Sequence, residues 1–431
     1  MIRDSKIFVF LTFCIAISFL FLMAVSAGNI VLGALGCFCL STYNMLRFVR
    51  RTPVFFVLFF IWLFSFDFTL VYYSGVPYYP FYKMEYINLV FLSMSVFQVL
   101  LLLVDSPKGY MTYDRVTLFS CNKTFYLLLT VFFIGTLSLK GENIFQSAKS
   151  YSAYQQNLAG ASGLNEYLIM LAMVLLLFSR GKIETLIFGC CLLIYIYKST
   201  VFGLRVQSLM VMIVFMMLFL KRDLKPLLTL LVSVSGFLLM LVFGFLKEGA
   251  DIQAIGLGMF VDDRYGYAQS HQQGVLSSST LIFNYQDNLA DFQYLGVPGA
   301  LLASTVQRRY VGDLIPWVYP SSYIQNFEYS PGGGIFTTQI VFLLGWPGLI
   351  VVCSLLVYLI NSFVVVRYSY KPYQVVGFMV FVVFFPRWVS YDFFSFFCRT
   401  FIWILLFVFA LKYFISNLRR QPLLMQKKNE I

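Results

Sequence analysis

The amino-acid sequence predicts an all-α, polytopic integral membrane protein, and three observations indicate this class. The chain of 431 residues is 60% hydrophobic and 12% charged, whereas soluble proteins carry about 25% charged residues. The apolar residues form long continuous runs that short polar segments separate. The basic residues gather in those short segments, as membrane orientation signals do. No basic stripe lies on a polar segment, which argues against nucleic acid as a partner.

A helix needs about 20 mostly apolar residues to cross a bilayer, and the sequence has about twelve runs of this kind. Backbone polar groups must be satisfied internally in lipid, so continuous runs predict helices, whereas barrel strands alternate apolar and polar residues. The first run lacks a small-residue cleavage site, so we expect a retained helix. The runs occupy residues 7–26, 28–46, 54–73, 86–104, 124–139, 164–179, 185–202, 206–220, 226–246, 335–361, 374–390 and 394–415.

Lysine and arginine clusters lie between alternate runs, and the positive-inside rule assigns these segments to the cytoplasm. Both termini are therefore predicted to be cytoplasmic, in a bacterial inner membrane. The longest polar segment, between the ninth and tenth runs, then lies outside as one large periplasmic loop. Residues 300–306, after Pro298, predict a short interfacial helix in it. The chain divides into nine helices (1–246), this loop (247–334), and three helices with a cytoplasmic tail (335–431). The basic clusters are Arg47/Arg50/Arg51, Lys108/Arg115/Lys123, Arg180/Lys182, Lys221/Arg222/Lys225, Arg367/Lys371 and Arg419/Arg420.

The sequence contains no recognisable metal or cofactor motif. Of the eight cysteines, seven lie within or at the edge of apolar runs and none lies in the long loop, so we expect membrane packing and no disulfide framework there. The only histidine, His271, lies in a polar stretch of that loop. No phosphate-binding glycine loop and no cluster with metal-ligand spacing is present. We therefore expect neither a metal nor a cofactor.

The outer ends of three runs predict an anion site. With a cytoplasmic N-terminus, each even-numbered helix begins at the outer face and presents free N–H groups there. The eighth begins at Gly203-Leu204-Arg205, the tenth follows Pro331-Gly332-Gly333-Gly334, and the twelfth carries Arg399 near its outer end. Arginine binds phosphate oxygens bidentately and keeps its charge. The candidate ligands of a diphosphate are Arg205, Arg264, Arg309, Arg387 and Arg399.

A simpler structural role is open for each of these residues. Arg205 could end a loop beside Lys198, and Arg387 could form an ion pair with Asp392 at the membrane edge. The triple glycine could be a hinge. Arg308 and Arg309 could contact a helix C-terminus or lipid headgroups, Arg264 could form a loop ion pair, and His271 could be solvated.

Several short motifs, in this order and topology, resemble one family. Gly203-Leu204-Arg205 resembles the Gly-x-Arg feature of the Wzy-type O-antigen (oligosaccharide repeat-unit) polymerases. The long outer loop with scattered arginines, closed by ProGlyGlyGly (331–334), is similar too. The resemblance extends to GlyTrpProGly (345–348) on the next helix and to the last hairpin, ProArgTrpValSerTyrAsp (386–392) with Arg399. It covers essentially the whole chain.

The resemblance implies a metal-independent membrane glycosyltransferase that joins undecaprenyl-diphosphate-linked repeat units at the periplasmic face and releases undecaprenyl diphosphate. Its partners would be the lipid-linked donor and acceptor glycans, membrane lipids and a chain-length regulator protein. The arginines would stabilise the leaving group. The general base is open among His271, Glu328, Glu248, Asp262, Asp263, Asp287 and Asp291. The predicted substrate-binding residues are Arg308, Gly332, Gly333, Gly334, Trp317, Tyr323 and Asp392, with Tyr319 as a further aromatic candidate.

Two different functions compete with this one. Twelve spans are common among carriers, so a lipid-linked oligosaccharide flippase is one of them, although the sequence lacks the two similar halves that many carriers have. An O-antigen ligase is the second. In the ligases a histidine precedes the Gly-x-x-Gly helix feature by a fixed interval, and the stretch around Gly334 and Ile335 has none.

Overall fold

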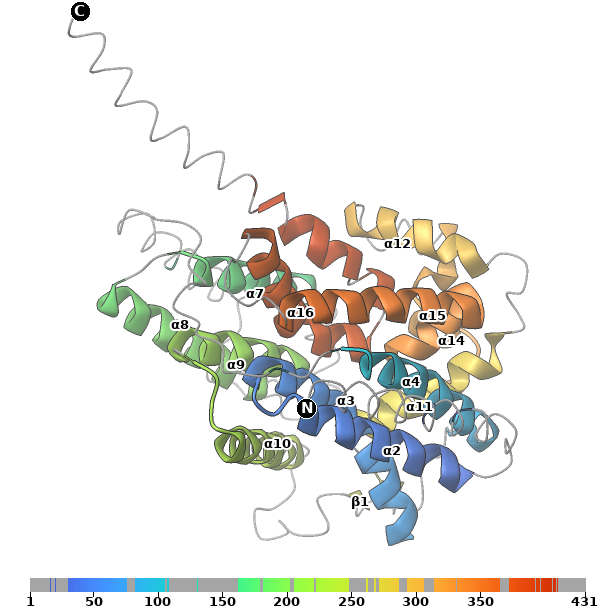
Figure 1. The fold of residues 1–431 in the computed structure, drawn as a ribbon. Coiled ribbons are helices and arrows are strands. Elements are labelled where there is room, and N and C mark those ends of the chain that lie inside the picture. Colours follow the sequence, from blue (N-terminus) through green and yellow to red (C-terminus); the bar gives the residue numbers. More distant parts are fainter. Residues whose placement is uncertain are drawn as a thin grey trace, which may run out of the picture. The chain divides into compact units, whose positions relative to one another are not determined.

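The computed structural model is helical throughout nearly all of the residues that it describes (Figure 1). Apart from single residues, these are 30–75, 82–104, 162–178, 181–201, 205–220, 222–247, 261–262, 267–268, 271–286, 293–305, 314–330, 332–364, 372–391, 393–395, 397–404 and 406–407. The exception is a short antiparallel pair of strands, β1 (Val261–Asp262) and β2 (Tyr267–Ala268). The coarse prediction of a helical protein is therefore confirmed.

The chain forms two compact units, Met1–Met111 with Arg222–Cys398 (unit 1) and Thr112–Lys221 with Arg399–Ile431 (unit 2). Unit 2 contains α7 (Ser162–Leu176), α8 (Lys182–Val201) and α9 (Arg205–Phe219). The helices of unit 1 are α2 (Ile30–Arg47), α3 (Thr52–Ser74), η1 (Met84–Tyr86), α4 (Ile87–Leu101), α10 (Pro226–Lys247), α11 (His271–Asn284), η5 (Gln293–Leu295), α12 (Gly296–Thr305), η6 (Pro316–Val318), α14 (Pro320–Ile324), α15 (Phe336–Val364) and α16 (Pro372–Ser390).

Within the described residues, four helices are long and apolar enough to cross a membrane: Thr52–Ser74, Met84–Leu101, Lys182–Thr200 and Phe336–Asn361. Shorter apolar helices correspond to most other runs. The runs at 7–26 and 124–139 lie almost wholly outside the described residues, so the number of spans stays a prediction. Large apolar side chains such as Ile183, Leu227 and Val351 are exposed on α8, α10 and α15, as expected where a helix faces lipid.

Helix α3 shows how the sequence sets these elements. Pro53 lies in its first turn, where its missing N–H costs nothing. The helix ends at Gly75, which has a left-handed conformation with φ of 69°. Between them the helix is apolar on all sides and mostly buried, except near its C-terminal end, as a helix inside a membrane bundle should be. The exception to this apolar character is Asp67, a buried carboxylate.

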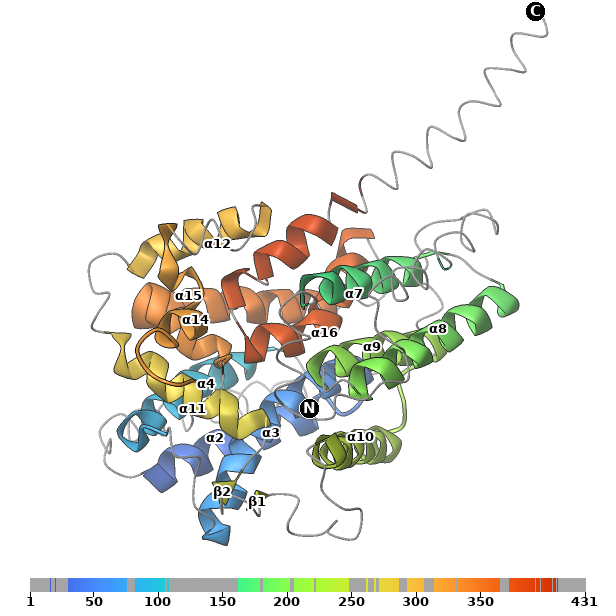
Figure 2. The same cartoon turned by 180° about the vertical axis from the view of Figure 1, so that it is seen from behind.

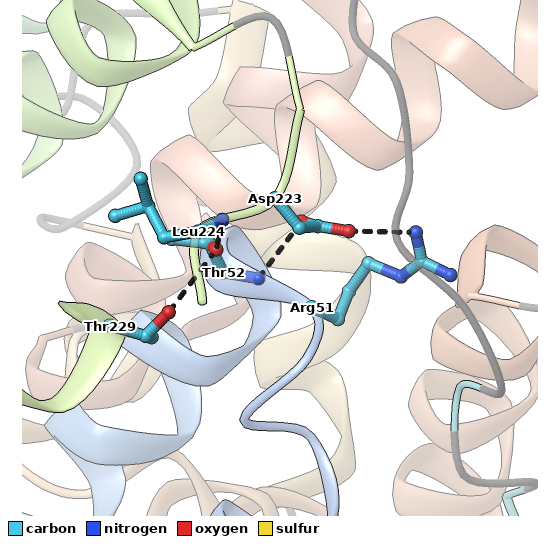
Figure 3. A network of polar contacts seen from close by, with 5 residues as sticks. All are labelled: Arg51, Thr52, Asp223, Leu224 and Thr229. Carbon is cyan, nitrogen blue, oxygen red and sulfur yellow. Dashed lines mark hydrogen bonds and ion pairs between the residues drawn. The ribbon is translucent and has the colours of Figure 1, made fainter. Parts of the chain in front are cut away.

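One end of unit 1 is held by charged groups (Figure 3). Arg51 pairs with Asp223 at 3.1 Å, and both side chains are buried. The second carboxylate oxygen of Asp223 accepts the backbone N–H of Thr52 at 3.0 Å, which caps the start of α3. The Thr52 hydroxyl accepts the N–H of Leu224 at 2.8 Å and lies 3.4 Å from the hydroxyl of Thr229. This network ties α3 to the segment that leads into α10.

The segment 247–334 contains more structure than the sequence indicated. Helix α12 overlaps the short helix predicted at 300–306. Helix α11 was not predicted, because its serines, threonine and glutamines are typical of a solvated loop. The structure instead buries most of its side chains, and the helix packs against α3, α4, α14 and α15. Figure 1 and the reverse view in Figure 2 show its place among the helices of unit 1. Hydrogen bonds to neighbouring elements make a buried polar helix possible.

Candidate functional site

The triple-glycine segment and the end of α16 meet in unit 1. The N–H of Gly334 donates to the carbonyl oxygen of Ser390 at 3.1 Å. The Gln339 side-chain amide donates to the carbonyls of Gly334 (2.8 Å) and Tyr391 (2.9 Å), and its oxygen accepts the N–H of Phe393 at 2.6 Å. Gln339 thus uses both ends of its amide to join the start of α15 to the chain that follows α16. We call this region the glycine junction (residues 332–335, 339, 390, 391 and 393).

Gly333 is required in the glycine junction for two reasons. Its φ of +84° lies in the left-handed region, which residues with a side chain rarely adopt. A Cβ at this position would also clash with the carbonyl oxygen of Ser390. The close approach of two backbones therefore depends on the absence of a side chain, which favours close approach over a simple hinge as the role of this glycine.

Helix α11 holds the glycine junction from another side. The Ser278 hydroxyl lies 2.9 Å from that of Ser330 and 3.2 Å from the carbonyl oxygen of Gly332. The Ser279 hydroxyl accepts the N–H of Ile335 at 2.9 Å, just before α15 begins. Three segments that are far apart in the sequence are thereby fixed by hydrogen bonds.

Arg387 lies beside this junction, one turn before the end of α16. Its side chain is buried, with 9% of the residue's surface exposed. The guanidinium lies over the ring of Tyr391, 3.8 Å from the ring centroid, and the carbonyl of Tyr391 accepts the bond from Gln339. A guanidinium over an aromatic face is attracted by the ring quadrupole, and its N–H groups point along the plane of the guanidinium. Of the two predicted arginines whose side chains the structure describes, Arg387 lies beside the glycine junction and Arg399 does not.

Glu328, a candidate general base, is engaged in an ion pair in unit 1. Its carboxylate lies 3.0 Å from the Lys83 ammonium and accepts the Tyr285 hydroxyl at 3.3 Å. The hydrogen bond from Lys83 to Glu328 raises the pKa of this lysine above its usual value. Burial, and then the Glu328 charge, raises the pKa of Tyr285. Lys83 and Tyr285 therefore stay protonated at neutral pH, and Glu328 is held as a partner of Lys83.

The aromatic candidates lie in packed surroundings. The Tyr323 ring contacts those of Phe327 and Phe342, with centroids 5.1 and 6.4 Å away. Trp317 lies against α12 at Gly296, where an added Cβ would be 3.4 Å from its ring. Among the described residues the indole nitrogen of Trp317 has no hydrogen-bond acceptor. Tyr319 is buried.

Arg399 belongs to unit 2, where it pairs with Glu166 at 3.6 Å. Glu166 lies near the start of α7, its side chain is 5% exposed, and it interacts electrostatically with Tyr195 in the last turns of α8. The end of α8 is joined to the start of α9, because the Ser208 hydroxyl lies 2.7 Å from that of Ser199. Arg399 is thus at the end of unit 2 where α9 begins.

Other predicted residues fall outside what the structure describes. Arg205 is the first residue of α9 and His271 the first of α11, but their side chains lie outside the described part. The same holds for Arg264, Arg308, Arg309 and Asp392, and for the general-base candidates Glu248, Asp262, Asp263, Asp287 and Asp291. Convergence of all the arginines on one diphosphate therefore stays a prediction.

Comparison with models of protein families, with curated proteins and with solved structures gave no match. In the described part of the chain, no three His, Cys, Asp or Glu side chains form a group that could hold a metal ion.

The sequence patterns did not single out two residues that the structure places in the polar interior. Gln339 is the central residue of the glycine junction, and nothing in the sequence distinguishes it from other glutamines. Asp67 had a usable signal, because it is an acidic residue inside the apolar run 54–73. An ionisable residue within a span is costly and is by default a candidate for function.

Proposed function

We propose that the chain is an O-antigen polymerase of the bacterial inner membrane. It joins undecaprenyl-diphosphate-linked oligosaccharide repeat units at the periplasmic face and releases undecaprenyl diphosphate. The proposal includes twelve spans, two cytoplasmic termini and a periplasmic segment 247–334. Its main support is the glycine junction. Two motifs of the family resemblance, the triple glycine and the Arg387 segment, lie more than fifty residues apart in the sequence and are hydrogen-bonded to each other.

The chemistry of the junction suits a departing diphosphate. In glycosyl transfer the leaving oxygen gains negative charge as its bond to the anomeric carbon breaks. Preorganised cations and N–H dipoles stabilise such charge most effectively where water is excluded. Arg387 supplies a buried cation. The N–H groups of Phe336 and Thr337, in the first turn of α15, have no acceptor within the helix, and the positive end of the helix dipole lies there.

Contacts within unit 1 support the sidedness in this proposal. At one end, Arg47 donates to the carbonyls of Leu101 and Leu102 that end α4, and Arg51 pairs with Asp223. The positive-inside rule assigns these segments to the cytoplasm.

Elsewhere in unit 1, segments that the proposal assigns to the periplasm contact one another. The backbone N–H of Lys83 donates to Thr280, and its side chain pairs with Glu328. No described contact of this kind joins a segment assigned to the cytoplasm to one assigned to the periplasm.

Deletion of the gene followed by gel analysis of the lipopolysaccharide tests the proposal. A strain that lacks its polymerase should retain core carrying a single repeat unit, because export and ligation still operate. Core alone would contradict the proposal and indicate a flippase or a ligase. An unchanged ladder would contradict a role in this process. Complementation with the wild-type chain should restore the full ladder and serves as the control.

A further inference from the structure

Asp67 is a buried carboxylate within the apolar helix α3, about two turns before the helix ends at Ser74. Only 4% of its surface is exposed, and its neighbours in the sequence are Phe66 and Phe68. On insertion scales an acidic residue costs about 2.5–3.5 kcal/mol at the centre of a membrane span, which is the upper value for a residue placed as Asp67 is. A hydrophobic residue at this position of α3 would avoid that cost. The presence of a carboxylate at this position, in spite of that cost, indicates a role for its chemistry.

Two residues from other elements orient this carboxylate. The Tyr82 hydroxyl donates to Oε1 of Gln273 at 2.8 Å, which leaves Nε2 of the same amide to donate to Oδ2 of Asp67 at 2.6 Å. Gln273 and Tyr82 are themselves buried. The carboxylate thus has a fixed position, as a group that takes part in chemistry requires.

Helix α11 connects Asp67 to the glycine junction. Gln273, which contacts Asp67, lies five and six residues before Ser278 and Ser279, which bind Gly332 and Ile335. At 1.5 Å per residue, Gln273 and these two serines are about 7.5–9 Å apart along the axis of α11. One short helix therefore contacts both the Asp67 carboxylate and the proposed diphosphate site, and its hydrogen bonds hold the two in fixed places within unit 1.

The other acidic side chains that the structure describes in unit 1 are in different settings. Asp223 pairs with Arg51, Glu328 pairs with Lys83, and Glu85 is exposed. Asp67 is the acidic side chain among them that combines burial with attachment to the helix that holds the glycine junction.

We propose that Asp67 is the general base of the transfer reaction, with Gln273 and Tyr82 as positioning residues. This inference rests on the proposed function. The hydroxyl oxygen of the acceptor sugar forms a bond with the anomeric carbon of the donor glycan, and its proton passes to the carboxylate of Asp67. The bond between that carbon and the diphosphate oxygen breaks, its electron pair stays on the oxygen, and undecaprenyl diphosphate leaves.

The test uses the full-length protein in nanodiscs, with lipid-linked single repeat units extracted from the deletion strain as substrate. Asp67→Asn keeps the size and an acceptor oxygen for Gln273 but removes the base. General-base catalysis contributes about 10²–10⁴-fold, so turnover should fall at least about 100-fold. The Kd for undecaprenyl diphosphate should change less than about 3-fold, because this variant leaves the glycine junction intact. Asp67→Glu should retain part of the activity.

Asp223→Asn is the matched control, because it makes the same change at a buried carboxylate that the mechanism does not use. Its turnover per folded molecule should stay near the wild-type value. Tyr82→Phe is a second, milder variant that removes only the hydroxyl orienting Gln273. Its kcat should fall about 10-fold with an unchanged KM, as expected for loss of positioning in the transition state.

The outcomes separate this inference from the proposed function. Wild-type turnover by Asp67→Asn, or an unchanged kcat in Tyr82→Phe, would overturn the assignment of Asp67 while leaving the polymerase proposal intact. A wild-type protein that binds the lipid-linked units and does not elongate them would overturn the polymerase proposal itself.

Discussion

At the scale of single residues, Arg387 tests the diphosphate site most directly. Lysine at this position would keep the positive charge but lose the planar fork that binds two phosphate oxygens and stacks on Tyr391. We expect Arg387→Lys to reduce polymer formation about 10–100-fold at normal protein levels, measured as loss of long chains on lipopolysaccharide gels. Arg47→Lys, which makes the same change at the end of α2, where the guanidinium donates to the Leu101 carbonyl, should leave the ladder unchanged. A full ladder from Arg387→Lys would show that this guanidinium does not bind the leaving group.

The backbone geometry at Gly333 predicts that a side chain there lowers the stability of the protein. Alanine there has to adopt a left-handed conformation and clashes with the carbonyl oxygen of Ser390. We expect Gly333→Ala to destabilise the protein by at least about 2 kcal/mol, measured as a lower thermal midpoint in detergent. The control is Gly236→Ala in α10, where nothing lies within 4 Å of the new Cβ. That change should leave the midpoint equal or slightly higher, because alanine favours a helix. Equal midpoints for the two variants would refute this account.

Arg399 needs a paired experiment because its partner is buried. Alanine alone would leave the Glu166 carboxylate without its cation, and loss of one member of a buried pair is more damaging than loss of both. Arg399→Ala should therefore lower the protein level, and Arg399→Ala with Glu166→Gln should restore it.

With the level restored, the double variant isolates the function of the arginine. If Arg399 binds diphosphate, the double variant should produce core with one repeat unit on the same gels. A full ladder would leave Arg399 with a structural role only.

At the scale of elements, the network around Asp223 predicts how α3 is anchored. Asp223 accepts from both the Arg51 side chain and the first N–H of α3 (Figure 3). Its removal leaves a buried guanidinium and an uncapped helix start. Asp223→Ala should cost about 3–5 kcal/mol, whereas Asp223→Asn, which still caps α3, should cost less. Denaturation in detergent, followed by tryptophan fluorescence, measures both. If Asp223→Ala lost less stability than Asp223→Asn, the result would contradict the anchoring role of Asp223.

Element boundaries could be predicted well where hydrophobicity decides them. The run 54–73 corresponds to Thr52–Ser74, and the run 226–246 corresponds to Pro226–Lys247. In both cases a proline lies in the first turn of the helix, and the length of the apolar run sets the rest. Helix α11 could not be found in this way, because its polar side chains are buried by specific partners that only the folded chain provides.

The candidate site, too, was predictable in part: its separate residues could be found from the sequence, whereas the contact between them could not. The sequence indicated Gly332–Gly334 and Arg387 separately, from backbone freedom and from a charge beside an apolar run. Their contact depends on Gln339, whose partners are backbone groups of Gly334, Tyr391 and Phe393. Every residue carries such backbone groups, so the sequence gives no sign of which ones a glutamine side chain will bind. Asp67, by contrast, could have been found from its position inside an apolar run.

At the scale of the whole molecule, the proposed sidedness leads to a labelling experiment. Arg50 and Tyr329 are both exposed, and the proposal assigns them to opposite faces of the membrane. Tyr329→Cys should react with a membrane-impermeant maleimide in intact cells, whereas Arg50→Cys should react only after the inner membrane is permeabilised. The native cysteines are first replaced by serine, and a ladder of normal length shows that the protein remains functional. Labelling of Arg50→Cys in intact cells would show that the topology is the reverse of the one proposed. The proposed diphosphate site would then lie on the cytoplasmic side, where polymerisation at the outer face could not use it.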